Sequence, residues 1–181
     1  SDGSLFSINY ANDVWSFVSQ KAHFFSVNTV SWLNTSNSNT SKILTGGNDG
    51  LIKLWSINQN GKIEKIQELF KAHESPIKSI EMIYNIEESN THRQNNFLSL
   101  DVDDNMFLWY SDVTSGTMEF KIEEIKFNES QIPSGIIHVS YKEQYCISVS
   151  TQESTFLYKQ IDKEWVIFSS TNTEGLIANY E

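Results

Sequence analysis

The sequence predicts an all-β fold built from repeated four-stranded units. Short apolar runs bounded by turn residues follow one another along almost the whole chain, and only Pro76 and Pro133 interrupt them. A strand–turn–strand unit also recurs, with spacings of 47 residues (2 to 49), 54 (49 to 103) and 49 (109 to 158). Such periods are typical of β-structures assembled from repeats, and no long amphipathic helix is visible.

The clearest copy of the unit runs from Thr45 to Trp55. Its Asp49-Gly50 step lies between two apolar runs, which is a strong signal for a tight hairpin. Beyond the turn, apolar residues occupy both faces of the strand, so we expect that strand to be buried on both sides. Upstream, Ala22-His23 precedes an apolar set formed by Val27, Val30 and Trp32.

The same features recur in three other places. In the second copy, Asp103 aligns with Asp49 of the first. The other aligned residues of the second copy are Ser99 with Thr45, Asp104 with Gly50, Trp109 with Trp55, His73 with His23, and Ile77, Ile80 and Met82 with the apolar set. A third copy aligns Ser148 with Thr45, Tyr158 with Trp55, and Ile136, Val139 and Tyr141 with the apolar set. At the start, Asp2-Gly3 aligns with Asp49-Gly50.

An Ala-His pair, a strand, a strand ending in Ser/Thr, an Asp-Gly turn and a strand ending in Trp form the pattern of WD40-type β-propeller blades. We therefore expect about three and a half blades of a larger propeller, the C-terminal half of a longer chain. The expected units are residues 1–20 (end of an incomplete blade), 21–70, 71–126, 127–169 (a degenerate last blade) and 170–181 (a tail). Open sheet edges in such a half predict self-association.

The expected strands lie near 4–10 and 14–19; 27–32, 42–46, 51–57 and 63–69; 77–84, 97–101, 106–110 and 118–125; and 136–141, 145–150, 154–159 and 164–169.

Composition narrows the function. A net charge of −10 argues against a nucleic-acid surface, which needs clustered Lys and Arg. The single cysteine, Cys146, cannot form a disulfide within the chain, which fits a reducing compartment. No apolar run is long enough to span a membrane, and no spacing of Cys, His or carboxylates suggests a metal or cofactor site.

Two polar networks are expected, one per well-preserved blade: His23, Thr45, Asp49 and Trp55, and His73, Ser99, Asp103 and Trp109. In each, the acid accepts from the histidine, the histidine meets the hydroxyl, and the hydroxyl accepts from the indole. A His, Ser and Asp set also fits a catalytic triad, but recurrence at blade spacing favours a packing element. The remaining acids near this turn, Asp101, Asp104 and Asp112, are expected at turns and on the surface.

Three stretches resemble the small propeller subunit of the outer COPII coat, which is shared with the Y-shaped scaffold of the nuclear pore. They are residues 27–32 with the following Gly-Gly-Asn-Asp-Gly turn, residues 71–80, and the last blade from Ile136 to Val166. The resemblance covers residues 2–168 in order. Pro76, the polar insertion 85–96 and Thr151-Gln152-Glu153 depart from that family's pattern.

The resemblance implies an open propeller of six blades, into which a large rod-forming partner or a scaffold nucleoporin inserts a seventh blade by strand addition. The last blade, 136–169, would flank that gap, with Val139, Tyr141, Phe156, Tyr158 and Trp165 as candidate contacts; for each, ordinary blade core is the alternative.

The function expected from this resemblance is that of a non-catalytic scaffold in ER-to-Golgi transport and in the nuclear pore. It would lie in the cytoplasm, peripherally at ER exit sites and COPII vesicles, and at the pore. The alternatives are the sister small propeller of the nuclear pore and a WD-repeat peptide-binding adaptor of a chromatin or ubiquitin-ligase complex.

Overall fold

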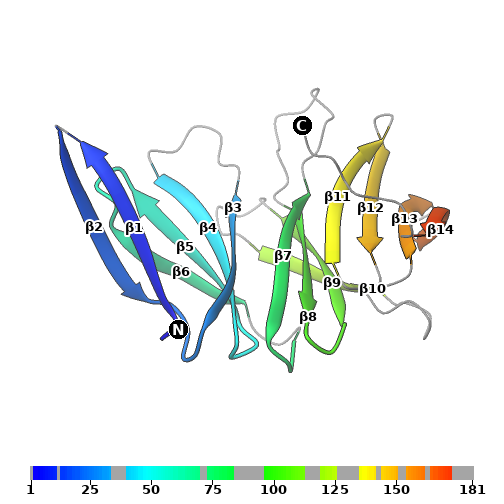
Figure 1. Cartoon of the computed structure of the whole chain (residues 1–181), viewed down its shortest axis with the longest axis horizontal. Helices are drawn as coiled ribbons and strands as arrows, with labels where there is room; N and C mark the ends of the chain where they lie inside the picture. The colour runs from blue at the N-terminus through cyan, green and yellow to red at the C-terminus, as the bar shows by residue number, and fades with distance from the viewer. Residues whose placement is uncertain are drawn as a thin grey trace.

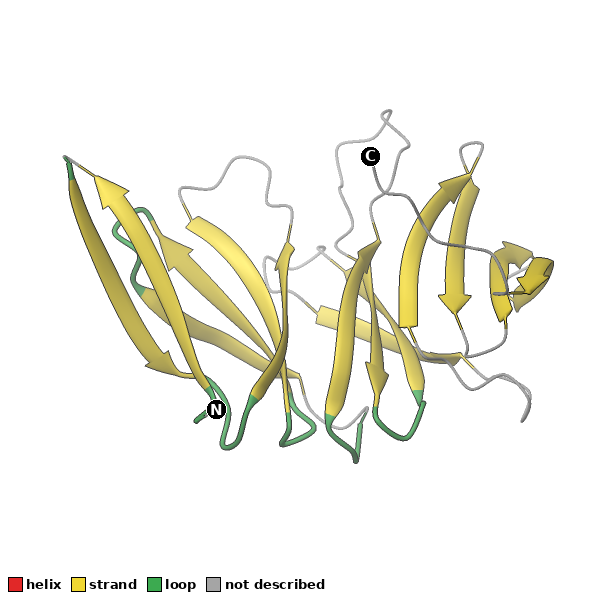
Figure 2. Cartoon of the chain, in the orientation of Figure 1, coloured by secondary structure: helices red, strands yellow, loops and turns green. Residues whose placement is uncertain are grey.

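A computed structural model describes residues 2–11, 13–33, 40–69, 73–83, 96–112, 119–125, 135–141, 144–150, 154–161 and 164–172. These residues form strands and connecting turns, with no helix among them (Figure 2). The strands are β1(Ser4–Ala11), β2(Val14–Lys21), β3(Val27–Leu33), β4(Thr40–Gly47), β5(Ile52–Asn58), β6(Ile63–Leu69), β7(Ile77–Ile83), β8(Asn96–Asp101), β9(Met106–Asp112), β10(Glu119–Ile125), β11(Gly135–Tyr141), β12(Gln144–Ser150), β13(Ser154–Ile161) and β14(Glu164–Asn172).

The strands build one two-stranded sheet, β1-β2, and three four-stranded sheets, in the orders β3-β4-β5-β6, β7-β8-β9-β10 and β11-β12-β13-β14. Every pairing is antiparallel between consecutive strands. The sheets stand side by side in chain order, and the first strands β3, β7 and β11 are neighbours (Figure 1). This is the arrangement of propeller blades, left open in the described chain, and it confirms the predicted fold class.

Every predicted strand is present, with ends displaced by three residues or fewer. The last strand reaches Asn172, beyond the predicted start of the tail, and the rest of the tail lies outside the described residues.

The first strands of two blades, β3 and β7, carry an irregularity that explains the spacing of their apolar residues. In β3 the pairing with β4 shifts between Val27 and Thr29, and in β7 the pairing with β8 shifts between Ile77 and Ser79. A β-bulge adds one residue and reverses the alternation of faces. Residues spaced at i, i+3 and i+5 therefore share one face, although a regular strand would separate them.

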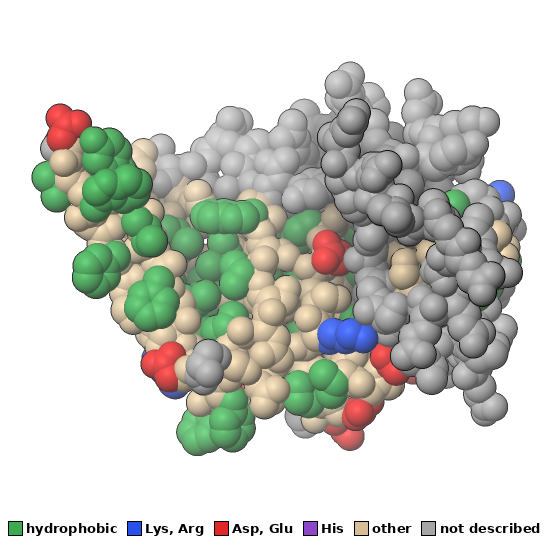
Figure 3. Space-filling model, viewed as in Figure 1, with side chains coloured by type: hydrophobic (Ala, Val, Ile, Leu, Met, Phe, Trp, Pro, Cys, Tyr) green, Lys and Arg blue, Asp and Glu red, His purple; other side chains and the backbone are tan. Residues whose placement is uncertain are grey.

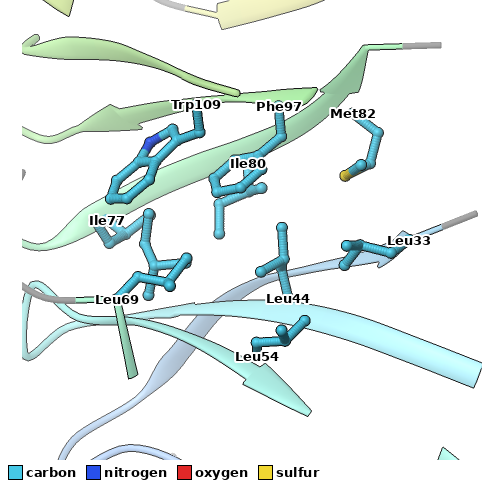
Figure 4. Packing of buried hydrophobic residues seen from close by; sticks show 10 residues of the cluster. Leu33, Leu44, Leu54, Leu69, Ile77, Ile80, Met82, Phe97 and Trp109 are labelled. Atoms are coloured by element: carbon cyan, nitrogen blue, oxygen red, sulfur yellow. The ribbon is translucent and has the colours of Figure 1, made fainter. Parts of the chain in front are cut away.

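The core lies between neighbouring sheets. Figure 4 shows Leu33, Leu44 and Leu54 of the β3–β6 sheet facing Ile80 and Met82 of β7. On the side of the β7–β10 sheet, the rings of Phe97 and Trp109 stack with centroids 5.3 Å apart, and Phe120 packs edge-on against both. Two similar clusters lie between β1–β2 and β3–β6, and between β7–β10 and β11–β14.

The turns before β1, β5 and β9 have the same backbone form. Gly3, Gly50 and Asp104 have φ of 77°, 74° and 65°. A positive φ favours glycine, and Asp is among the few other residues that adopt it readily. The turn at Gly3 also joins two sheets, because its carbonyl accepts hydrogen bonds from the backbone N–H groups of Ala22 and His23 at 2.9 and 3.0 Å.

Candidate functional sites

The first predicted network is present in full. Trp55 Nε1–H donates to Thr45 Oγ1 at 2.9 Å, Thr45 Oγ1 lies 2.7 Å from His23 Nε2, and His23 Nδ1 lies 2.8 Å from Asp49 Oδ1. A neutral imidazole satisfies all three bonds only if Nδ1 carries the proton and Nε2 accepts from the hydroxyl. The network thus ties β4 and β5 to the segment that enters β3.

The second network has the predicted histidine, hydroxyl and indole, but a different acid. Trp109 Nε1–H donates to Ser99 Oγ at 2.7 Å, which lies 2.6 Å from His73 Nε2. His73 Nδ1 meets Asp101 Oδ2 at 2.9 Å, not Asp103. The prediction of Asp103 was therefore wrong: Asp103 is exposed and accepts from Ser75 Oγ, whereas Asp101, expected at the surface, is fully buried.

The reason is a change at the end of the second strand. In the register of the sheets, Gly47 pairs with Val27 as Asp101 pairs with Ile77. A Cβ at Gly47 would come within 2.2 Å of His23 Nδ1, so that place is open to the carboxylate of Asp49 reaching back from the turn. In the second blade Asp101 occupies the place itself. The useful sequence signal was the replacement of the second glycine of Gly46-Gly47 by an acid.

Asp101 also organises its own turn. Its Oδ1 accepts from the backbone N–H groups of Asp103 and Asn105 at 3.0 and 2.9 Å, and Asn105 Nδ2 donates to both carboxylate oxygens. Burial raises the pKa of Asp101, but the bonds from His73 and Asn105 outweigh burial and hold the pKa below its usual value.

Asp49 follows the same balance. Burial raises the pKa of its carboxyl, but the hydrogen bonds from Phe24 N–H and His23 together lower the pKa by more than burial raises it. The pKa is therefore below its usual value, and the carboxylate form prevails. The pKa of His23 and that of His73 are both lowered, because burial disfavours the imidazolium more than the neighbouring carboxylate favours it. The neutral histidine and ionised acid deduced from the geometry are thus also the electrostatically preferred forms.

Different side chains pack beside the two networks. In the first blade Lys53, itself buried, donates to the carbonyl of Ala22 at 2.9 Å and lies 3.9 Å from Asp49 and 3.8 Å from Glu68. In the second, Phe107 packs edge-on against His73 with centroids 4.8 Å apart. Lys53 is a structural residue that the sequence pattern did not reveal, since its hydrogen-bond partner, the Ala22 carbonyl, lies 31 residues away in the chain.

The hydroxyls of the networks are not placed for catalysis. Thr45 and Ser99 are fully buried, and in each the oxygen already accepts an indole N–H. A nucleophile must reach a substrate carbonyl, and both hydroxyls are closed off from solvent by burial. The geometry supports the packing interpretation over the triad interpretation.

The third blade keeps parts of the pattern. Ser148 and Tyr158, aligned with Thr45 and Trp55, are both buried. Gln152 and Ile132, which replace the acid and the histidine, lie outside the described residues. The pairing of β11 with β12 runs from Gly135 to Tyr141 without the shift seen in β3 and β7.

The predicted flank residues separate into two groups. Tyr158 is buried, and Phe156 half-buried, in the cluster with Leu98 and Met106 of the preceding blade. This contradicts their assignment to the gap and matches the alternative, blade core. Val139 and Tyr141 lie on β11 and Trp165 on β14, but their side chains are outside the described residues.

The position of Tyr158 has a general reason. Trp55, Trp109 and Tyr158 occupy aligned places on the third strand, and each packs into the cluster shared with the preceding sheet. A residue at this place therefore faces the N-terminal neighbour in all three sheets.

A group of uncovered apolar side chains lies at the other end of the row of sheets. Phe6, Ile8 and Tyr10 of β1 share a face with Trp15 and Phe17 of β2 by register, and all five are exposed. Leu5, on the opposite face of β1, is buried against the β3–β6 sheet. Figure 3 shows hydrophobic side chains gathered over this end of the molecule.

The described residues contain no group of His, Cys, Asp and Glu able to hold a metal ion. In the same part of the chain there is no helix long and apolar enough to cross a membrane. A search of protein-family models and a search of curated proteins find no match to this sequence.

Proposed function

We propose that this chain is part of a WD-repeat β-propeller that acts as a non-catalytic scaffold subunit. The observation that carries the proposal is the buried chain of indole, hydroxyl, histidine and carboxylate, which recurs in two adjacent blades with matching contacts. Such a network satisfies buried polar groups and fixes the geometry of a sheet, which serves a rigid framework.

We further propose the scaffold of the COPII coat, with a second role in the outer ring of the nuclear pore. The support is the collinear set of sequence stretches from residue 27 to residue 166 that resemble the small propeller subunit of that coat. The partner would be a large rod subunit or a scaffold nucleoporin, bound beside β11–β14. Val139, Tyr141 and Trp165 remain the candidate contacts there.

The test is affinity purification of the protein from its own cells, with mass spectrometry of the proteins recovered. We expect a large rod subunit of the coat, with or without nucleoporins, and a loss of that subunit in Trp165→Ala. The matched control is Phe24→Ala, which removes an aromatic ring that is 77% exposed in the β2–β3 connection. Nucleoporins alone would indicate the sister propeller, and recovery of chromatin or ubiquitin-ligase subunits would overturn the coat proposal.

A further inference from the structure

The outer edge strand of the third four-stranded sheet can be compared directly with those of the two sheets before it. The order β11-β12-β13-β14 contains all four strands of a blade, and β14 has a neighbour on one side only among the described strands. The strands β6 and β10 hold the same place in their own sheets. The edge at β14 is therefore a feature of a complete blade.

The edge strands β6 and β10 are charged along their length, whereas β14 is not. β6 carries Glu64, Lys65 and Glu68, and β10 carries four charged residues in seven positions. β14 has nine residues, of which only the first, Glu164, is charged. Charged side chains on an edge strand oppose its pairing with a further strand, so this protection is present in β6 and β10 and absent from β14.

The difference is clearest at one aligned position. In each sheet, one residue of the fourth strand pairs with the residue that directly follows the aligned aromatic residue of the third strand. This residue is Glu64 in β6, Lys121 in β10 and Val166 in β14. Val166 is 41% exposed, and Ile167, on the opposite face of the strand, is 38% exposed. An apolar side chain thus replaces the charge of the other two edges.

We propose that β14 pairs antiparallel with β14 of a second copy of this chain, so that the two sheets join edge to edge into one continuous sheet. The contact is isologous, because the same strand of both copies forms it about a two-fold axis. Backbone groups of β14 that face away from β13 form the hydrogen bonds. The site lies at the opposite end of the row from β1 (Figure 1), and it does not depend on the proposed function.

A second copy fits this edge because β14 is complementary to itself. Pairing about the middle of β14 places Glu164 of one copy beside the uncharged end, Thr171-Asn172, of the other, so the two glutamates lie far apart. The same pairing of β6 about Ile66 would set Glu64 of one copy opposite Glu68 of the other. Since each copy carries a net charge of −10, contact along a strand with few charges is favoured.

This contact is separate from association through the exposed apolar face of β1 and β2. A chain with both contacts would form open oligomers, because each copy would bind one neighbour at each end. The test therefore uses the whole protein with Ile8→Ser and Phe17→Ser, which removes apolar side chains from that face and leaves β14 unchanged. In this protein we expect a dimer.

Two substitutions of opposite charge test the edge. Val166→Lys and Val166→Glu introduce the residue types that β10 and β6 carry at the aligned position, so the sheet should accept both. The matched control is Ile122→Lys, which replaces an aliphatic side chain, 44% exposed, on the already charged strand β10. Sedimentation over a range of concentrations gives the dimer dissociation constant, and hydrogen exchange reports on the amides of β14.

We expect the dissociation constant to rise by at least about tenfold in both Val166 variants, because either charge blocks an edge strand, and to stay unchanged in the control. With Val166 present, the amides of β14 should exchange more slowly as the concentration rises. A monomer at every concentration, an effect of only one sign of charge, or an equal effect of Ile122→Lys would overturn the proposal. So would protection of β14 that is independent of concentration, because another segment would then cover the edge.

Discussion

Gly47 of β4 and Asp101 of β8 occupy the same place in their sheets, opposite Val27 and Ile77, and are used in opposite ways. The glycine leaves room for a carboxylate that comes from the turn, whereas the aspartate supplies the carboxylate from the strand. In both blades a carboxylate oxygen meets the histidine Nδ1, at 2.8 and 2.9 Å. The carboxylate thus keeps its place beside the histidine, although the aspartate that carries it stands two positions earlier in the aligned sequence of the second blade.

This relationship predicts unequal effects of two neighbouring substitutions. Asp101→Asn removes a buried, hydrogen-bonded carboxylate and should lower the free energy of unfolding by about 1–3 kcal/mol. Asp103→Asn alters an exposed side chain and should change it by less than about 0.5 kcal/mol. Urea unfolding of both variants measures the difference. A larger loss for Asp103→Asn would contradict the assignment of the acid.

Removal of a central hydroxyl should be costly. Thr45→Val leaves the Trp55 indole N–H and the His23 Nε2 without a partner in a buried site, and we expect a loss of about 1–3 kcal/mol. Thr45→Ser keeps the oxygen and deletes one methyl group, which should cost under about 1.5 kcal/mol. Thermal unfolding checks the order of the two variants, and equal losses would show that packing, not hydrogen bonding, sets the requirement.

The histidines predict a pH dependence. Their folded pKa values are lowered from 6.5, so the folded chain binds fewer protons than the unfolded chain once the pH falls below that value. The stabilisation is full above about pH 6.5 and is lost progressively as the pH falls toward the folded pKa. NMR titration of the imidazole signals should give lower midpoints for His23 and His73 than the same chain in urea. Midpoints at or above the unfolded value would refute the neutral assignment.

Two glycines with positive φ, Gly3 and Gly61, should differ in their tolerance of alanine. At Gly61 a Cβ would lie 3.2 Å from Ser7 Oγ, a side-chain contact that a small shift relieves, so Gly61→Ala should cost mainly the backbone strain, about 1–2 kcal/mol. At Gly3 a Cβ would come within 1.7 Å of the Phe25 carbonyl oxygen, so the backbone must also shift and the cost should be greater. Denaturant midpoints of the two variants test this, and a milder effect at Gly3 would argue against the close approach.

The exposed face of β1 and β2 predicts self-association of this chain. Ile8 and Phe17 lie opposite each other on that face, and replacing both with Ser should shift the protein toward monomer without lowering its melting temperature. Leu5→Ser, on the other face of β1, is the matched control and should lower the melting temperature instead. Sedimentation and thermal unfolding separate the two effects; a fall in stability for the double variant would show that its face is already covered.

The fold was predictable because strand period, turn residues and repeat spacing agree. Asp2-Gly3 and Asp49-Gly50 mark the same turn in sequence as in structure. The bulge in β3 was not predicted and is seen only in the register of the sheet. The acid of the second network was not predictable from spacing alone, since Asp101 lies two residues beyond Ser99 and Asp103 four. The aspartate at the position of Gly47 decides between them, because that position is the one beside the histidine. The buried Lys53 depends on a carbonyl from a distant segment, which no local pattern records.

The hydrogen bonds to the Gly3 carbonyl have a consequence for the unfolding of the molecule. This carbonyl holds the N–H groups of Ala22 and His23, so the turn before β1 anchors the histidine that belongs to the following sheet. Opening of β1 and β2 would therefore loosen His23, and with it the hydroxyl and indole behind it. In an array where each sheet contacts only its neighbours, such a link couples the unfolding of one sheet to that of the next. The cooperativity of unfolding therefore depends on the contacts between sheets.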